Sequence, residues 1–318
     1  DTLEDIEALS GRRLPNVHLD GLRDICVSNR TRRLIGAPFR TNVLAQMFRM
    51  DRLANAGRGA SVVQVDPSDC GGLERITASV NGAFPDGVVA YSNEISNTPA
   101  EVFLWLYRAC GAAVEDYSEG GPIRLKRAIA ERCRQIMNGW GRRRVASGEV
   151  VSDMLAPRLD GPLLGYAWAS WLALLSSGTA DLESLLKSRA ANGRTSLELR
   201  FGAVPMRGAW ILSVPREAVR SRALEASLAA KLAMRLSSET DAQAYLWAIG
   251  ALPAASALWA GNDPRMPMWV KATYESPGES LGDAARRACG SHRLRLADPA
   301  LHRFRCRDPL CPRQGLCA

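Results

Sequence analysis

The sequence predicts an α/β fold, because helical patterns and short strand patterns alternate along an apolar chain without internal repeats. Of its 318 residues, 47% are hydrophobic, which allows a sizeable buried core and is typical of a globular protein. Each strand pattern is short and lies between segments with helical periodicity. The expected strands cover residues 61–65, 87–92, 198–204 and 210–214.

Helices are expected at four places. The tetrapeptide TPAE at 98–101 is a capping box with proline at the first helical position, and Gly111 follows the last apolar residue of that helix. Trp105 and Trp247 lie within predicted helices, where burial in the core is the expectation. The expected helices cover residues 98–110, 123–137, 217–236 and 241–249.

The last 33 residues differ in kind from the rest. Residues 286–318 contain eight Arg and two Asp, so they carry most of the net charge of +8. They also contain Cys289, Cys306, Cys311 and Cys317. No C-x-x-C pair occurs, and the spacing fits no common zinc finger, so no metal site is expected. A disordered, solvated tail is the expectation, with nucleic-acid or anion binding as an alternative.

The motifs of common enzyme classes are missing. The sequence has no G-x-S-x-G, no P-loop and no G-x-G-x-x-G, and His18 is the only histidine before the tail. We therefore expect no catalytic residues and no cofactor. An α/β enzyme with an unrecognised site stays open as an alternative.

Tryptophan offers a different chemistry. Trp168, Trp171 and Trp210 each follow a nearby glycine where a loop meets an element. An indole there can present a flat apolar face while its N–H donates a hydrogen bond. Sugars combine apolar C–H faces with many hydroxyls, so such platforms suit them, although packing at a domain seam would also explain these residues.

Neither a membrane helix nor a signal peptide is expected within this sequence. The longest apolar candidate, residues 161–175, is shorter than the roughly 20 residues that a membrane helix needs. The N-terminus has no apolar segment of a signal peptide, so none is expected in this chain. The chain starts with Asp1, which is consistent with a processed product or a fragment.

Residues 36–53, GAPFRTNVLAQMFRMDRL, place polar groups ahead of an apolar run. Arg40 and Asn42 stand just before residues 43–50. Composition alone does not explain why side chains that form directional hydrogen bonds stand at the start of a buried strand.

Five segments, taken in order, resemble the extracellular solute-binding proteins of ABC importers, family 1. They are most similar to the carbohydrate-binding cluster that includes maltose-binding protein. The first, IGAPFRTNVLAQMFRMDRLANAG, resembles a G-hyd-P-(Y/F)-R-T-(N/D) segment of that family. The segments are residues 35–57, 99–121, 161–175, 201–216 and 236–264.

The resemblance implies a two-lobed periplasmic-binding-protein-like fold of type II, with the solute in a cleft between the lobes. The N-terminal lobe would comprise residues 1–44 and 211–258, and the C-terminal lobe residues 45–210 and 259–285. Only 35 residues precede the G-hyd-P segment, so the N-terminal lobe is expected to be incomplete, as in a truncated relative.

The same resemblance implies a function and a site. The protein would bind a sugar or related carbohydrate outside the cytoplasm, in the periplasm or at the cell surface. It would deliver the solute to the ABC permease subunits as a monomer, without catalysis and without nucleic acid. The implied ligand-binding residues are Arg40, Asn42, Asn93, Glu94, Trp168, Gly208, Ala209 and Trp210.

Overall fold

The computed structural model consists of two compact units that the chain enters more than once. Unit 1 comprises residues 1–45, 168–189 and 195–292, and unit 2 comprises residues 46–167, 190–194 and 293–318. The lobe boundaries expected from the sequence stay a prediction. The structure describes residues 3–19, 21–28, 30–56, 69–80, 84, 88–92, 98–111, 125–140, 143–145, 147–170, 172, 181–191, 193–201, 207–260, 263–275 and 280–290.

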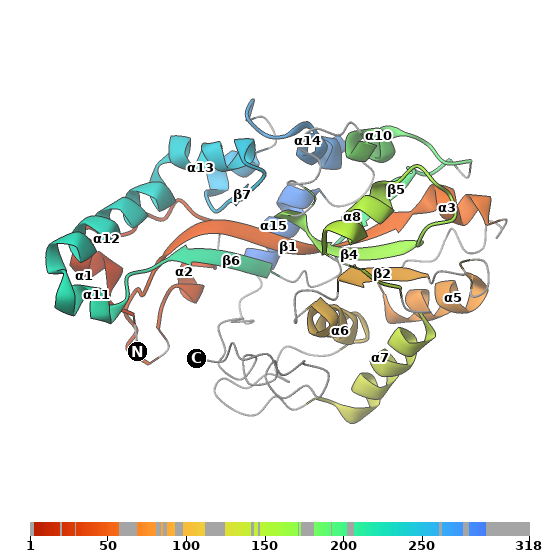
Figure 1. The fold of residues 1–318 in the computed structure, drawn as a ribbon, viewed down its shortest axis with the longest axis horizontal. Helices are drawn as coiled ribbons and strands as arrows, with labels where there is room; N and C mark the ends of the chain where they lie inside the picture. Colours follow the sequence, from red (N-terminus) through yellow and green to blue (C-terminus); the bar gives the residue numbers. More distant parts are fainter. Residues whose placement is uncertain are drawn as a thin grey trace. The chain divides into compact units, whose positions relative to one another are not determined.

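Strand β1, Ala37–Arg49, is the longest strand and belongs to both units (Figure 1). Its first part pairs antiparallel with β6, Arg207–Leu212, and with β7, Leu252–Pro253. Nearly the whole strand is buried, which agrees with the apolar run 43–50. The polar entry noted in the sequence is therefore the part of β1 that lies in unit 1.

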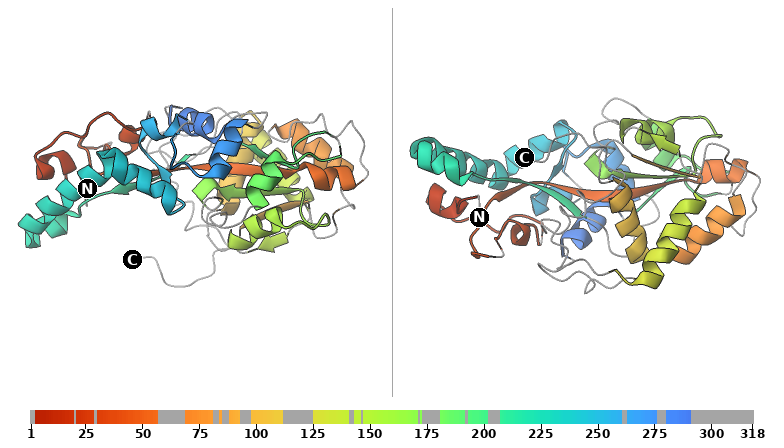
Figure 2. Two further views of the ribbon diagram at one scale, coloured as in Figure 1. Left: turned by 90° about the horizontal axis from the view of Figure 1, so that it is seen from above. Right: turned by 60° about the horizontal axis from the view of Figure 1, so that its bottom comes forward.

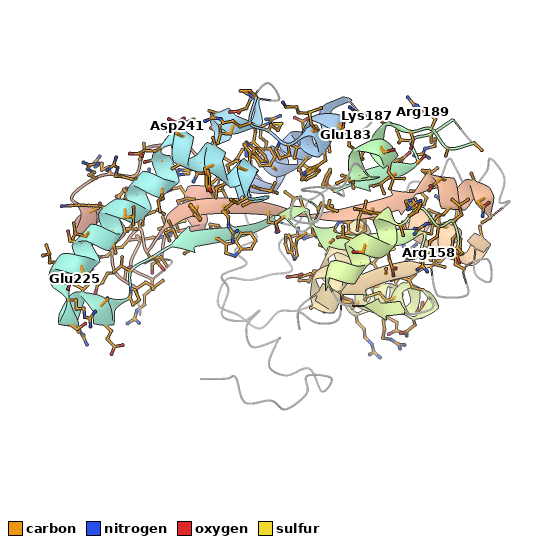
Figure 3. The ribbon with its side chains drawn as sticks, turned by 45° about the horizontal axis from the view of Figure 1, so that its top comes forward. Arg158, Glu183, Lys187, Arg189, Glu225 and Asp241 are labelled. Carbon is orange, nitrogen blue, oxygen red and sulfur yellow. A yellow bond between two sulfur atoms is a disulfide. The ribbon has the colours of Figure 1, made fainter. Side chains whose placement is uncertain are left out.

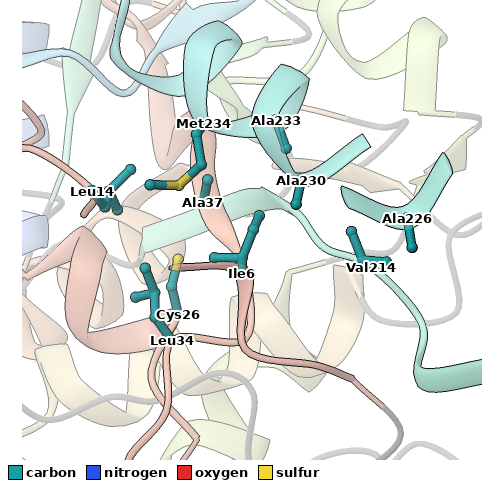
Figure 4. Packing of buried hydrophobic residues seen from close by; sticks show 10 residues of the cluster. All are labelled: Ile6, Leu14, Cys26, Leu34, Ala37, Val214, Ala226, Ala230, Ala233 and Met234. Carbon is teal, nitrogen blue, oxygen red and sulfur yellow. The ribbon is translucent and has the colours of Figure 1, made fainter. Parts of the chain in front are cut away.

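Unit 1 is built from helices around this end of β1. Ten residues form its hydrophobic cluster, and α1 lies beside α12 (Figures 2 and 4). Its further elements are α1 (Ile6–Ser10), α2 (Leu22–Ile25), α10 (Asp181–Lys187), β5 (Leu197–Arg200), α11 (Arg216–Ser221), α12 (Ala223–Ser238), α13 (Thr240–Ala248), η2 (Ser256–Trp259), α14 (Met268–Glu275) and α15 (Leu281–Gly290).

Unit 2 has a parallel arrangement in which β2 pairs with both β3 and β4. The disulfide Cys70–Cys110 joins the start of α5 to the residue after α6. Its elements are α3 (Met50–Asn55), α5 (Cys70–Val80), β2 (Val89–Ser92), α6 (Thr98–Ala109), α7 (Arg127–Gly139), β3 (Arg143–Val145), α8 (Ser147–Leu155) and β4 (Leu164–Trp168, whose last residue is in unit 1).

Two buried arginines explain the polar residues at the end of the FRMDRL motif. The Arg49 guanidinium donates to both carboxylate oxygens of Asp51, at 2.8 and 2.7 Å, and to the Met154 and Ala156 carbonyls. Among the described residues, the Arg52 guanidinium donates to backbone carbonyls, including those of Asp153 and Ala156 at 2.7 and 3.0 Å. Burial, with the nearby Arg49 charge, lowers the pKa of Arg52 to about 9, which leaves it charged at neutral pH. Both cations therefore complement the C-terminal dipole of α8.

Most of the expected elements are confirmed where the structure describes them. Helices α6 and α13 match their predictions, as do strands β2, β5 and β6 within a few residues. Trp105 and Trp247 are buried, as expected. The strand expected at residues 61–65 and the tail after residue 290 lie outside the described residues.

One helix prediction needs a correction. The run expected as a single helix over 217–236 forms two helices, α11 and α12, because Arg222 has a non-helical backbone with φ −147° and ψ 66°. The break gives α12 its own orientation, with Ala226, Ala230 and Met234 in the hydrophobic cluster. Helix propensity alone does not anticipate it, because every residue there tolerates a helix. No described helix is long and apolar enough to cross a membrane.

Candidate functional site

The candidate site lies on the antiparallel ladder between β1 and β6 in unit 1. Arg40 is paired with Trp210, and Asn42 with Gly208. Side chains alternate between the two faces of a strand, so these four positions share one face of the ladder. Ala209, paired with Thr41, belongs to the opposite face.

Arg40 covers the indole of Trp210. The Arg40 Cζ lies 4.3 Å from the ring centroid, which is cation–π distance. Trp210 nevertheless keeps 42% of its surface exposed, an unusual state for so large an apolar side chain. The Arg40 Nε–H is buried and finds no hydrogen-bond partner in the described part of the chain. The pair is thus an ordered aromatic surface next to an unused donor.

Trp168 lies directly above Gly208. A Cβ atom at Gly208 would be 3.3 Å from Trp168 Cζ3 and also 3.3 Å from the Asn42 Cβ. Both separations are tighter than ordinary van der Waals contact. The glycine therefore provides the space in which the indole approaches the strand, on the same face as Trp210.

Asn42 holds the segment that follows Trp168. Its Nδ2 donates to Ser170 Oγ at 2.8 Å, while its Oδ1 accepts from the backbone N–H groups of Ser170 and Val43, each at 3.0 Å. Asn42 is buried, so this amide is committed to holding Ser170 and positioning Trp168. That arrangement favours a positioning role over direct contact with a solute.

The strand is irregular just before Arg40, and two polar side chains compensate for it. The β1–β6 register shifts between Pro38 and Arg40, which disturbs the normal ladder hydrogen bonds. Ser237 Oγ donates to the Pro38 carbonyl at 2.5 Å, and Gln243 Nε2 donates to the Phe39 carbonyl at 3.1 Å. The orientation of Arg40 therefore depends on residues more than 190 positions away.

A buried histidine supports this contact. His18 Nε2 lies 2.9 Å from the Ser237 carbonyl and 2.8 Å from Ser237 Oγ. Because the Ser237 hydroxyl already donates to the Pro38 carbonyl, His18 Nε2 must carry a proton and donate to Ser237. Desolvation lowers the pKa of His18 and the Arg23 charge lowers it further, while the Ser237 backbone hydrogen bond raises it.

The structure places the sequence-predicted residues unequally. Arg40, Asn42, Trp168, Gly208 and Trp210 gather on one face, whereas Ala209 occupies the other. The predicted residues outside the described part are Asn93, Glu94 and Trp171. The sequence did not identify the supporting residues Ser170, Ser237 and Gln243. Ser237 and Gln243 lie in the quoted segment 236–264, but the partners of all three are distant in sequence, so no local pattern indicates their role.

Metal binding finds no support in the part of the chain that the structure describes. There, no group of three or more His, Cys, Asp or Glu side chains is placed to hold an ion. What the face offers is an aromatic surface, a cation and hydrogen-bonding groups. Such a combination is chemically suited to a polar solute with apolar faces.

Comparisons with known proteins reveal the fold. No protein-family model matches the sequence, and no curated protein matches it. Solved structures do match. The maltose-bound MalE3 of T. maritima is 15% identical, with a TM-score of 0.58 over 96% of this chain and 79% of that one. UgpB from Mycobacterium tuberculosis, in complex with glycerophosphocholine, is 15% identical, with a TM-score of 0.58 over 96% and 78%.

A third match is the GacH receptor of Streptomyces glaucescens GLA.O, solved unliganded and with acarbose. It is 14% identical, with a TM-score of 0.55 over 91% of this chain and 77% of that one. The chain has the fold of a type II periplasmic solute-binding protein. This fold confirms the α/β class and the type II periplasmic-binding-protein-like fold that the resemblance of the five segments implied.

Proposed function

We propose that this chain is the extracytoplasmic solute-binding component of an ABC importer, and that it binds a sugar or a related polar solute. It delivers the solute to a permease and catalyses no reaction. The observation that carries the proposal is the Trp210 indole, covered on one face by Arg40 and exposed over 42% of its surface.

The same face explains why the solute would be a sugar or resemble one. A pyranose ring packs its C–H face on an indole and keeps its hydroxyls for hydrogen bonds. Trp210 and Trp168 provide two such surfaces on one face of the β1–β6 ladder. The half-buried Arg40 guanidinium would donate to an oxygen of the solute. MalE3 and GacH hold maltose and acarbose, and UgpB holds glycerophosphocholine, so this fold accepts both kinds of ligand.

A disulfide supports the extracytoplasmic location. Cys70 and Cys110 are bonded within unit 2. Disulfides form and persist in oxidising compartments such as the periplasm and the cell surface, and they are rare in the cytosol. The same compartment is where a permease would receive the solute.

The test is calorimetric titration of the full chain with maltose, longer maltooligosaccharides, acarbose and glycerophosphocholine, together with tryptophan fluorescence. We expect saturable binding of at least one of them, with the compound recovered unchanged. Trp210→Ala should weaken that binding roughly five- to thirtyfold, since stacking on an indole is worth roughly 1–2 kcal/mol.

Tyr245→Ala is the matched control. It removes an exposed aromatic side chain that lies about 200° around α13 from Gln243, the residue whose amide contacts β1, so affinity should not change. Equal losses from both variants would contradict the site. Conversion of the titrated compound to a product would favour the α/β enzyme instead. Binding of nucleic acid that weakens steeply with salt would favour the basic tail as the active part.

A further inference from the structure

Helix α12 carries an apolar stripe on the side turned away from its own unit. Leu224, Leu228 and Leu232 are 71%, 55% and 57% exposed, and they are four residues apart. Residues at that spacing line up on one side of a helix. The opposite side of α12 already packs in the unit's own cluster (Figure 4). The exposed leucines therefore lie outside the hydrophobic cluster of this unit, and nothing in the described part of the chain covers them.

Two opposite charges flank this stripe symmetrically. Glu225 comes three residues before Leu228 and Lys231 three residues after it. At 100° per residue, that places them about 60° to either side of Leu228 around the helix. Both side chains are exposed, and neither makes an ion pair with the described part of the chain (Figure 3 labels Glu225). By contrast, the next cation, Arg235, is already bound to Glu239 at 2.7 Å.

We propose that the α12 stripe, Leu224, Leu228 and Leu232, is the contact surface of a homodimer of this chain. A two-fold axis along the stripe places each leucine against its own copy. The same rotation exchanges the two flanks, so Glu225 of each copy faces Lys231 of the other. Packing rows of residues spaced by four against each other is the commonest class of helix contact, with axes crossing near −50°. The interface is isologous, as expected for a dimer.

Charge selects this arrangement over the other two-fold packing of the same stripe. An axis perpendicular to the stripe would place Leu224 against Leu232, but it would also bring Glu225 against Glu225 and Lys231 against Lys231. Opposed like charges are unfavourable, whereas the proposed axis forms two opposite-charge pairs. This inference does not depend on solute binding, and it departs from the monomer that the sequence resemblance implied.

Sedimentation equilibrium of the full 318-residue chain tests the proposal. We expect a concentration-dependent dimer, and Leu228→Glu should abolish it, because it places two carboxylates at the centre of the stripe. Leu228 is exposed, so the fold should survive, which circular dichroism can verify. Ala223→Glu is the matched control. It adds the same charge at an exposed position five residues earlier, about 140° around the helix from Leu228, and should leave dimerisation unchanged.

Charge exchange identifies the orientation. Glu225→Lys and Lys231→Glu should each weaken the dimer by about tenfold, because each replaces two attractive pairs by two repulsive ones. Combining both substitutions in one chain should restore the wild-type dissociation constant. A chain that sediments as a monomer at every concentration overturns the proposal, and another segment or partner then covers the stripe. A dimer whose dissociation constant is changed by none of these substitutions overturns the proposal too.

Discussion

The guanidinium of Arg40 lies over the indole of Trp210, with its Cζ 4.3 Å from the ring centroid, and the two residues are paired across β1 and β6. Arg40 restricts the indole on one side, so the exposed remainder of Trp210 is held in a single orientation. Preorganised aromatic surfaces bind with a smaller loss of conformational freedom. The Arg40–Trp210 contact on the β1–β6 ladder should therefore increase the affinity of the proposed site.

Replacing Arg40 separates charge from shape. Arg40→Met keeps a long apolar stem but removes the cation–π contact and the donor, so solute affinity should fall about tenfold or more. The free energy of unfolding should change by no more than about 1 kcal/mol, because an exposed cation–π contact is worth only that much. Calorimetric titration and urea unfolding measure the two quantities. Unchanged affinity in a folded Arg40→Met variant would remove Arg40 from the site.

Asn42→Ala should lower stability as well as affinity. The substitution removes Asn42 Oδ1, which accepts from the buried N–H of Val43 and the half-buried N–H of Ser170, and this loss costs roughly 1–3 kcal/mol. Trp168 should then lose its position, and binding should weaken. Ser170→Ala removes only the hydroxyl that accepts from Asn42 Nδ2, so its effect should be smaller. In a double-mutant cycle by urea unfolding, a coupling energy near zero would contradict the role of this pair.

The sequence was informative about elements and much less so about contacts. The segment LSSETDAQ predicted helix and a family-like motif, but it could not show that Ser237 and Gln243 bind the carbonyls of Pro38 and Phe39. Those carbonyls need side-chain donors because the register of β1 shifts there, and a shift of register leaves no local sequence pattern.

Strand periodicity could have refined the site prediction. Gly208, Ala209 and Trp210 are consecutive, so in a strand the middle residue must face away from the other two. The family resemblance treated all three as one contact. For Asn42, by contrast, periodicity does not help. The neighbouring sequence does not show whether the Asn42 amide faces a ligand or, as in the structure, forms hydrogen bonds with Ser170.

His18 should make stability depend on pH. Burial lowers the pKa of its ring below the ordinary 6.5, so the unfolded chain binds the proton first as the pH falls. The contribution of His18 is therefore complete above about pH 6.5 and is lost as the pH falls from there toward the folded-state pKa, by at most about 1.4 kcal/mol per pH unit. The protonated ring would also carry a buried Nδ1–H, and Nδ1 has no partner among the described residues.

His18→Gln isolates this effect. The amide can still donate to the Ser237 carbonyl but does not titrate, so the free energy of unfolding should depend less on pH between 7 and 5 than in the wild type. Urea unfolding at several pH values, compared with the value at pH 8, measures the difference. Parallel curves for both proteins would show that another group is responsible.

Removing the disulfide should destabilise unit 2 under oxidising conditions. Cys70 and Cys110 are 40 residues apart, and closing a loop of that length restricts the unfolded chain by roughly 3–4 kcal/mol. The double variant Cys70→Ser, Cys110→Ser should lose about that much in urea unfolding. Dithiothreitol should lower the stability of the wild type toward the same value and leave the variant unchanged, which separates the disulfide from general effects of the reductant.

The buried thiols Cys26 and Cys133 serve as internal references for alkylation under native conditions, because both should stay unmodified until the protein unfolds. If the oxidised wild type is no more stable than the double variant, the bond does not constrain the unfolded chain, and the argument for an oxidising compartment loses its physical basis.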